Sequence, residues 1–271
     1  MKDDGRCRNY NFDEVVLVDI KVIIAVHKPY WMPMEGCYLP LHVGKEGKSD
    51  LGFIGDNTGK NISFKNANYC ELTGIYWAWK NLKADYIGLC HYRRYFAKNS
   101  GGGNVQKKRE SIFTAEDYRT LLQKYDVIVP KKRNYYIETV RSQYEHAHNK
   151  FDLDEAEKIL NQFYPEYSEA FNKVMGRKKL HLYNMFVMEK KLYDSYCSWL
   201  FTILFELEKR TDVANYNQYE ARVFGFLSER LFNVWLEKRN LKKKEVNVVF
   251  LEKQDWMKKG SKFLVRKFGV K

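Results

Sequence analysis

Three short apolar runs separated by polar turns constrain this chain more than any other feature of its sequence. They are Lys21–Val26, Tyr86–Cys90 and Tyr125–Pro130. The second and third runs follow segments with helical periodicity at Asn66–Leu82 and Thr114–Lys124. Continuous apolar runs of this length are typical of strands buried on both faces of a parallel sheet. Their alternation with helices predicts an α/β fold with a mostly parallel central sheet flanked by helices.

The second half of the sequence continues the alternation with a rising share of helix. We expect a strand at Tyr183–Met188 and a late strand at Val246–Leu251. Between them the periodicity predicts helices over about Lys191–Lys209 and Tyr219–Lys238. The chain is therefore expected to end in a helix-rich part.

Two helix starts carry capping signals. Thr114 is followed by acidic residues in the first turn, and Asp152 stands three residues before Glu155 in capping-box spacing. The D-x-D sequence at 152–154 is thus interpreted as the start of a helix, with a metal site as the weaker alternative. His146 and His148 diverge on the helix expected there, which argues against a two-histidine metal site.

Composition and charge indicate a globular protein with an anionic partner. Of the 271 residues, 45% are hydrophobic, which suffices for one large domain or two closely joined lobes. Lys and Arg number 47 against 34 Asp and Glu, and residues 237–271 alone hold twelve basic and four acidic residues. Such an excess is typical of proteins that bind nucleic acid, an anionic membrane or a phosphorylated substrate.

Cysteine usage and hydropathy bear on the compartment. The five Cys form no C-x-x-C pair, which predicts a reducing compartment. The first 20 residues lack the apolar core of a signal peptide, and no run approaches the ~20 apolar residues of a membrane span. We expect a 1–20 extension, a domain over 21–251 and a basic amphipathic tail over 252–271.

Polar and cationic residues follow each of the three apolar runs. The clusters are His27–Tyr30, His91–Phe96 and Lys131–Arg133. Ligands of α/β enzymes bind beyond the carboxyl ends of parallel strands. In the second cluster, adjacent guanidinium groups between tyrosines offer donors for a diphosphate and aromatic faces for a ring. The third cluster is better explained as a solvated loop. No P-loop, dinucleotide-binding glycine motif or G-x-S-x-G elbow occurs.

Five segments in order over about residues 21–251 resemble the bacterial capsular and exopolysaccharide glycosyltransferases, a family that includes galactofuranosyltransferases. The segments are Val22–Tyr30, Asp56–Trp79, Tyr86–Phe96, His181–Met188 and Arg222–Leu236. The resemblance implies a GT-A-like nucleotide-sugar fold and a site on the cytoplasmic face of the cell membrane. It also implies donor-side roles for His27, Lys28, Asp56, Asn61, Asn66 and Glu71.

The usual GT-A enzyme holds a divalent metal on a D-x-D motif after a central strand. At that position this chain has His91, Tyr92, Arg93 and Arg94. The substitution removes carboxylates that a hard cation needs and supplies two fixed positive charges for the departing nucleoside diphosphate. We therefore infer that no metal is required, with Mn²⁺ or Mg²⁺ as the alternative.

Inverting transfer requires a base for the acceptor hydroxyl proton. Glu229 occupies the late region where such enzymes often place it, and a helix glutamate paired with an arginine is the structural alternative. His181 and Asp152 are the weaker candidates for the base. The candidates for acceptor or phosphate contacts are His148, Asn184, Arg222 and Arg230.

The combined prediction is a glycosyltransferase that moves a sugar from UDP-galactofuranose or another UDP-hexose to a lipid-linked saccharide in capsule, exopolysaccharide or O-antigen synthesis. The basic, aromatic segment Asp255–Lys271 is expected to bind an anionic membrane surface, a frayed tail being the alternative. Two rival functions are a nucleic-acid-binding protein and a catalytically inactive assembly subunit. The first is disfavoured because the excess charge concentrates at the C-terminus instead of along one face.

Overall fold

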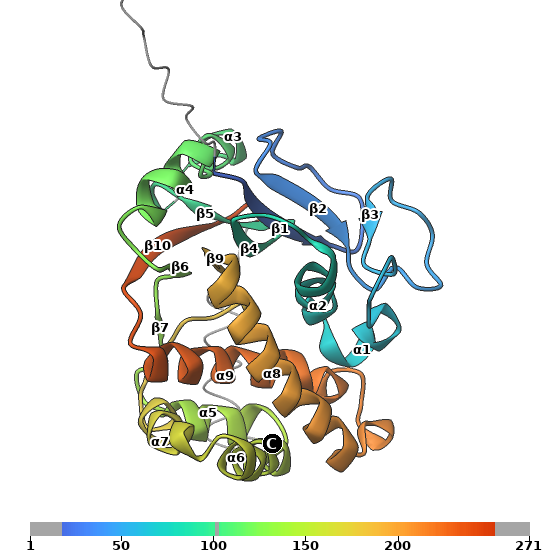
Figure 1. Cartoon of the computed structure of the whole chain (residues 1–271), viewed down its shortest axis with the longest axis vertical. Helices are drawn as coiled ribbons and strands as arrows, with labels where there is room; N and C mark the ends of the chain where they lie inside the picture. Colours follow the sequence, from blue (N-terminus) through green and yellow to red (C-terminus); the bar gives the residue numbers. More distant parts are fainter. Residues whose placement is uncertain (1–17, 101–102, 253–271) are drawn as a thin grey trace, which may run out of the picture.

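The computed structural model describes residues 18–100 and 103–252, and its centre is an eight-stranded sheet (Figure 1). The strand order is β3-β2-β1-β4-β5-β10-β6-β9, and β9 pairs with β4 as well. The strands of this sheet are β1 (Ile20–Val26), β2 (Tyr38–His42), β3 (Ile54–Gly55), β4 (Tyr86–His91), β5 (Arg94–Ala97), β6 (Val127–Pro130), β9 (Phe186–Glu189) and β10 (Lys243–Phe250). A small second sheet pairs β7 (Arg133–Asn134) with β8 (Lys179–Leu180).

Helices cover both faces of this sheet. The α-helices are α1 (Asn66–Tyr69), α2 (Leu72–Asn81), α3 (Val105–Glu110), α4 (Ala115–Leu122), α5 (Val140–Ala147), α6 (Lys150–Phe163), α7 (Ser168–Met175), α8 (Lys190–Arg210) and α9 (Val223–Arg239). Short 3₁₀ turns are η1 (Ser63–Lys65), η2 (Pro165–Tyr167), η3 (Val213–Asn215) and η4 (Glu220–Arg222). Figure 1 shows α5 to α9 gathered on one side of the sheet and α3 and α4 at its far end.

The apolar run in β1 is buried on both faces, as its composition predicts. Ile23 and Ala25 belong to the core beneath α2 and α6 to α9. Val22, Ile24 and Val26 belong to a second core on the opposite face. Successive side chains of a strand point to opposite faces, so a strand covered on both sides is apolar throughout.

The expectation of a mostly parallel sheet is not met, because the sheet is mixed. The pairings β1–β2, β1–β4, β2–β3 and β6–β10 are parallel. The pairings β4–β5, β4–β9, β5–β10 and β6–β9 are antiparallel. Strands buried on both faces have the same apolar composition in either direction, so their sequence does not reveal how they pair.

The edge of β4 that faces away from β1 is shared by two partners. β9 pairs along it from Tyr86 to Leu89, and β5 pairs only at its end, where His91 faces Arg94. Gly88 makes the approach of β9 possible, since a Cβ there would lie 2.6 Å from the Phe186 carbonyl oxygen. The sheet therefore forks at the carboxyl end of β4.

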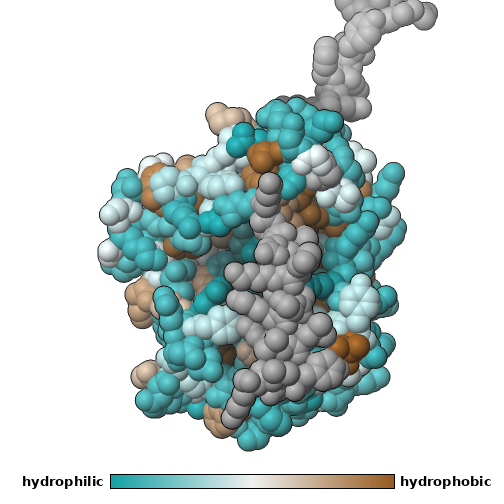
Figure 2. All heavy atoms as spheres, turned by 180° about the vertical axis from the view of Figure 1, so that it is seen from behind, coloured by the Kyte–Doolittle hydropathy of each residue, from teal (hydrophilic) through white to brown (hydrophobic). Residues whose placement is uncertain are grey.

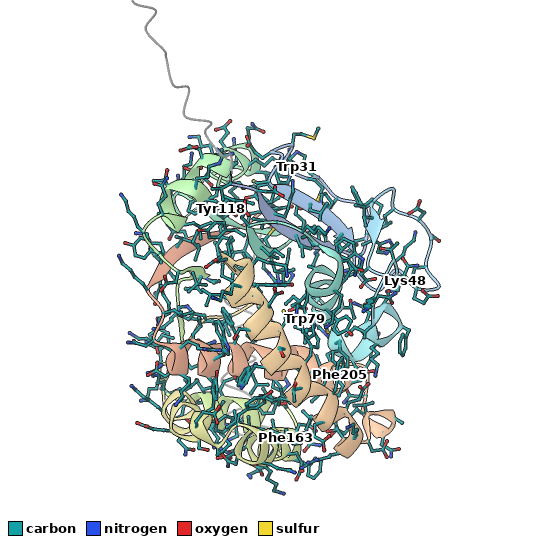
Figure 3. All side chains as sticks on the ribbon, in the orientation of Figure 1. Trp31, Lys48, Trp79, Tyr118, Phe163 and Phe205 are labelled. Carbon is teal, nitrogen blue, oxygen red and sulfur yellow. The ribbon has the colours of Figure 1, made fainter. Side chains whose placement is uncertain are left out.

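Aromatic rings pack α2 against α8 on one side of the sheet. Trp79 of α2 stacks on Phe201 of α8 with 5.9 Å between ring centroids, and Phe205 packs beside Phe201 at 5.6 Å. Figure 3 shows Trp79 and Phe205 at the contact between α2 and α8, and Tyr118 on the other side of the sheet, beneath α4. Trp79 thus serves the core, as does Trp77, which is buried and donates to the Thr58 hydroxyl at 2.8 Å.

The observed start of one helix agrees with the sequence-based prediction, whereas the starts of two other helices and one strand differ from it. Thr114 caps α4 through a capping box with Asp117, as predicted. Asn149, not Asp152, caps α6, so the cap lies three residues earlier than expected. The helix expected from Tyr219 begins as η4 and becomes α9 at Val223. The strand expected from residue 183 begins only at residue 186.

None of the described helices is long and apolar enough to cross a membrane. Figure 2 shows one face of the molecule, on which hydrophilic residues predominate and hydrophobic ones form small patches. The tail from Asp255 to Lys271, predicted to bind membranes, lies outside the described residues.

Replacing Gly88 by Ala is expected to lower the free energy of unfolding by about 1–3 kcal/mol, because the new methyl group would overlap the β9 backbone. Urea denaturation measures the change. Gly36→Ala is the control, since nothing lies within 4 Å of a Cβ at that position, and it should stay within about 0.5 kcal/mol of wild type. Equal stability of the two variants would show that β9 does not press against β4.

Candidate functional site

A cleft of about 900 Å³ opens where β1 and β4 end, between the sheet and the first turns of α9. Its lining comes from segments far apart in the sequence. The lining residues are Ala25, His27, Val43, Lys48, Asn66, Ala67, Cys70, Glu71, His91, Tyr92, Arg93, Arg94, Tyr183, Gln218, Ala221, Arg222, Gly225, Phe226 and Glu229. The carboxyl ends of two parallel strands thus meet at this cleft, as expected for a ligand site of an α/β fold.

His91 is the last residue of β4 and is locked in one orientation. Its Nε2 lies 2.7 Å from the Tyr183 carbonyl oxygen. A carbonyl can only accept, so Nε2 carries the ring proton. Burial lowers the pKa of His91, and Arg94 lowers it further while Glu71 opposes them. A neutral ring with its proton on Nε2 leaves Nδ1 as an acceptor.

Tyr92 and Arg93 form the two-residue turn between β4 and β5. One Arg93 amino group donates to Glu252 at 2.6 Å and the other to the Tyr92 hydroxyl. The Tyr92 hydroxyl also lies 3.4 Å from His27 Nε2. Partial burial and the cations Lys28 and Arg93 lower the pKa of His27, so its ring is neutral near pH 7. Arg93 is therefore committed to neighbours at the rim of the cleft.

Arg94 and Arg222 are different, because neither guanidinium is in direct contact with a carboxylate among the described residues. The Arg94 guanidinium lies 5.0 Å from the ring centre of Tyr183. Arg222 donates from Nε to the Cys70 sulfur at 3.2 Å and lies 5.4 Å from the Phe226 ring. Within residues 18–100 and 103–252, neither guanidinium forms an ion pair with a carboxylate. Two such groups in one cleft can bind an anion with several oxygens.

Glu229 holds the loop that precedes β9. One of its oxygens accepts the Tyr183 backbone N–H at 2.7 Å, and the other accepts from Arg230 at 3.1 Å. Burial raises the pKa of Glu229, and Arg230 and the Tyr183 amide oppose the rise. The side chain lines the cleft, and both of its carboxylate oxygens are engaged.

Asn184 lies beneath the cleft floor and orients a second carboxylate. Its amide nitrogen donates to Glu71 at 2.8 Å and to the Gly225 carbonyl at 3.3 Å, and its oxygen accepts from Ser228. Asn184 is 1% exposed, so it positions other groups and does not contact an acceptor. Glu71 was expected on the donor side, with a buried pair with an arginine such as Arg93 as the alternative; the structure places it in the cleft lining at the break between α1 and α2, and Arg93 pairs with Glu252 instead.

The break at Glu71 has a local cause. Cys70 has φ 53°, which ends α1 after one turn. Asn66 donates to the Cys70 carbonyl at 2.7 Å, and a Cβ at Gly225 would lie 3.2 Å from the Cys70 sulfur. Burial raises the pKa of Cys70 to about 11, so it is an uncharged thiol that accepts from Arg222.

Other predicted donor-side residues do not line the cleft. Asp56 is fully buried and accepts from the backbone N–H groups of Gly44 and Lys45, which shapes the loop after β2. Asn61 donates to the Gly59 carbonyl, and Lys28 is exposed. The exposed cluster at 131–133, expected as a solvated loop, does not line the cleft, although Arg133 lies beside Tyr183, which does.

The weaker candidates for the base lie away from the cleft as well. His181 is buried with Nδ1 2.6 Å from the Pro130 carbonyl oxygen, and burial lowers its pKa to about 4. Asp152 is 2% exposed within α6 and accepts from the Tyr216 hydroxyl at 2.7 Å. Burial raises the pKa of Asp152 to about 6, and the hydrogen bond from Tyr216 opposes the rise.

His148 and Arg230 stand one layer behind the cleft wall. The His148 ring stacks on Phe226 with 4.1 Å between centroids, and Phe226 lines the cleft. Arg230 is 3% exposed and donates to the Phe226 carbonyl and to Gln143. Among the described residues no group of three or more His, Cys, Asp or Glu side chains could hold a metal ion.

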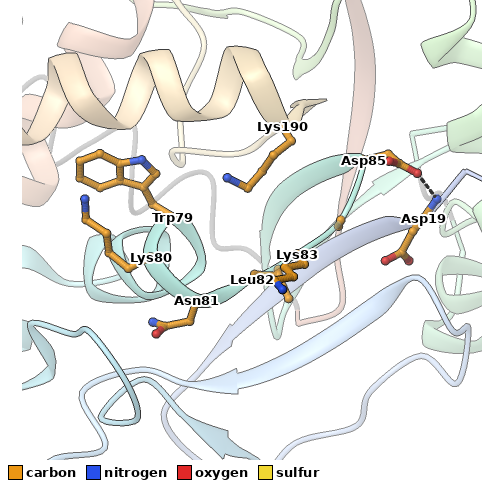
Figure 4. A pocket seen from close by; sticks show the side chains of 9 residues that line it. Asp19, Trp79, Lys80, Asn81, Leu82, Lys83, Asp85 and Lys190 are labelled. Atoms are coloured by element: carbon orange, nitrogen blue, oxygen red, sulfur yellow. Dashed lines mark hydrogen bonds between the residues drawn. The ribbon is translucent and has the colours of Figure 1, made fainter.

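A second hollow of about 650 Å³ lies at the other end of β4, beside Trp79 and Asp85 (Figure 4). Several of its polar groups are engaged by their neighbours. The Lys80 ammonium lies 3.1 Å from the Trp79 ring centre, and Asp85 accepts the Asp19 backbone N–H at 2.8 Å. Figure 4 shows these groups spread around the hollow without a common point toward which they converge.

Comparison with known proteins gives one family and one similar structure. The model of a family described as "Domain of unknown function (DUF4422)" matches residues 21–240. The fold is similar to that of WbbM, a bifunctional glycosyltransferase solved in its apo form, with a TM-score of 0.78 and 33% sequence identity. The match covers 87% of this chain and 46% of that chain, so this protein spans about half of WbbM. No curated protein matches significantly.

Replacing Asp152 by Asn should stabilise the protein at pH 7.5 and leave its activity unchanged. The pKa of Asp152 is about 6 in the folded protein and about 3.9 in an unfolded chain, so the folded state binds the proton more tightly. Protonation of Asp152 therefore makes its full contribution to the free energy of unfolding below about pH 4. That stability is lost as the pH rises through 6. The variant keeps an acceptor for Tyr216 and should gain up to about 3 kcal/mol at pH 7.5.

Urea denaturation at pH 7.5, 6.5 and 5.5 should show this advantage narrowing as the pH falls. The matched control on the same helix is Asp154→Asn, which removes ion pairs with Arg141 and Lys150 and should be neutral or destabilising. A destabilised Asp152→Asn protein at pH 7.5 would contradict the assignment of Asp152 as a buried, uncompensated carboxylate.

Proposed function

The chain belongs to the DUF4422 family, and we propose that it is a glycosyltransferase that takes its sugar from a nucleotide-sugar bound in the cleft at the ends of β1 and β4. The observation that carries this proposal is the pair Arg94 and Arg222, whose guanidinium groups have no carboxylate partner among the residues described. Similarity to WbbM, which is named a bifunctional glycosyltransferase, supports the same reaction class.

The cleft suits the leaving group of such a reaction. When the bond between the anomeric carbon and the diphosphate breaks, negative charge develops on the phosphate oxygens. Fixed cations such as Arg94 and Arg222 stabilise that charge more in the transition state than in the ground state. The Tyr183 ring beside Arg94 and the Phe226 ring beside Arg222 offer flat apolar surfaces for a base or a sugar ring.

The finer assignment follows from the family resemblance and is part of the proposal. The fold is of the GT-A type, the donor is UDP-galactofuranose or another UDP-hexose, and the acceptor is a lipid-linked saccharide. The product belongs to a capsule, an exopolysaccharide or an O-antigen. The protein works on the cytoplasmic face of the cell membrane, to which the basic segment 252–271 attaches it.

Replacing Arg94 or Arg222 by Ala should lower the rate of transfer about 30- to 1,000-fold. Loss of a charge-assisted contact to a diphosphate costs on the order of 2–4 kcal/mol of transition-state stabilisation. UDP release from a panel of UDP-sugars measures the rate, and thermal unfolding checks the fold. Arg119→Ala is the control, because Arg119 pairs with Glu116 on the surface of α4. Wild-type rates in both cleft variants would refute the diphosphate site.

UDP release should persist in excess EDTA. Arg94 and Arg222 supply in the cleft the positive charge that a divalent cation would otherwise bring to the diphosphate. The measurement is the rate before and after chelation, with Mn²⁺ and Mg²⁺ added back separately. A rate abolished by EDTA and restored by either metal would show that the diphosphate site needs a cation.

A further inference from the structure

Two carboxylates reach the cleft, Glu71 and Glu229, and they differ in what their oxygens already bind. Glu229 accepts the Tyr183 backbone N–H on one oxygen and Arg230 on the other. Its side chain is 19% exposed. Because both of its oxygens are already engaged, an acceptor hydroxyl would have to compete with the Tyr183 amide and Arg230 for Glu229, although burial raises the pKa of this carboxyl.

Only one of the two carboxylate oxygens of Glu71 has a hydrogen-bond partner among the described residues. Its Oε1 accepts from Asn184 at 2.8 Å. Its Oε2 has no hydrogen-bond partner in the part of the chain that the structure describes, and the residue is only partly buried. Glu71 lines the cleft, and only one of its two carboxylate oxygens is engaged by a protein group.

The surroundings of Glu71 suit a reaction in which a diphosphate leaves. Glu71 is the strongest charge acting on the pKa of His91, and it also acts on Arg222. The carboxylate thus lies within electrostatic reach of the guanidinium that we assign to the leaving group. Asn184 donates directly to the Glu71 carboxylate. The preceding residue, Cys70, is fixed by the hydrogen bond from Asn66 and by its close packing against Gly225.

We propose that Glu71 is the general base of the transfer and that Glu229 is a positioning residue that fixes the 183–184 loop. This assignment rests on the proposed glycosyl transfer. The acceptor oxygen forms a bond to the anomeric carbon while the bond from that carbon to the diphosphate oxygen breaks. The acceptor proton passes to Glu71 Oε2, and the electron pair leaves with the nucleoside diphosphate, which Arg94 and Arg222 hold.

The test compares Glu71→Gln with wild type in donor hydrolysis, where water is the acceptor. Glutamine keeps the oxygen that accepts from Asn184 but cannot take a proton. UDP release should fall about 10²- to 10⁴-fold, while the Kd for UDP from calorimetry and the melting temperature stay near the wild-type values. Formate added to Glu71→Ala should restore part of the rate, which a purely structural role would not allow.

Two controls separate the roles. Glu229→Gln places an amide N–H group opposite Arg230, so it should lower the melting temperature by several degrees as well as the rate. Glu116→Gln alters only a surface pair on α4 and should match wild type. Nuclear magnetic resonance should show the sugar released first with inverted anomeric configuration, since a base-assisted single displacement inverts that carbon.

The outcomes distinguish the two levels of the proposal. Wild-type UDP release in Glu71→Gln, or a retained anomeric configuration, would overturn the role of Glu71 and leave glycosyl transfer standing. Absence of UDP release from wild type with every UDP-sugar in the panel would overturn the proposed function and the base assignment together.

Discussion

The left-handed turn at Tyr183 and Asn184 is the constraint on which the cleft depends. Their φ angles are 75° and 52°, a conformation that costs side-chain-bearing residues about 1–3 kcal/mol each. Buried hydrogen bonds offset that cost. Glu229 accepts a hydrogen bond from the Tyr183 backbone N–H, and the Asn184 side chain donates to Glu71 and accepts from Ser228. The turn sends β9 antiparallel between β4 and β6 and presents the Tyr183 carbonyl to His91.

Burial around this turn sets the charges of the site. Removal from water raises the pKa of Glu229 and lowers the pKa of His91, which disfavours the charged form of each side chain. Arg230 and the Tyr183 amide counteract this effect at Glu229, and Glu71 counteracts it at His91. Arg94 and Arg222 keep their charge in any such environment, since guanidinium groups do not lose their proton in proteins. The cleft therefore combines oriented carboxylates, a neutral imidazole and two permanent cations that can act on an entering anion.

The residues of the site were predictable to different degrees. His91 and Arg94 follow an apolar strand directly, and a strand end is where the sequence pattern places a ligand site. Glu71 was indicated only by the family resemblance and not by a strand end, because it lies inside a segment with continuous helical periodicity. The helix breaks there because Cys70 adopts φ 53°, a backbone conformation outside the helical region. Asp56 and Asp152 resembled functional carboxylates, yet each is buried against its own neighbours.

The sequence by itself determined which segments are buried strands and where the cationic clusters follow them, because apolar runs and charged turns are local properties. Only the tertiary structure decided the direction of β9 and β5, since a strand covered on both faces has the same composition in either direction. It also decided which groups the carboxylates of Glu71 and Glu229 bind. Hydrogen bonds from Asn184, Tyr183 and Arg230 set which carboxylate oxygen stays free, and those partners are brought together by contacts between distant segments.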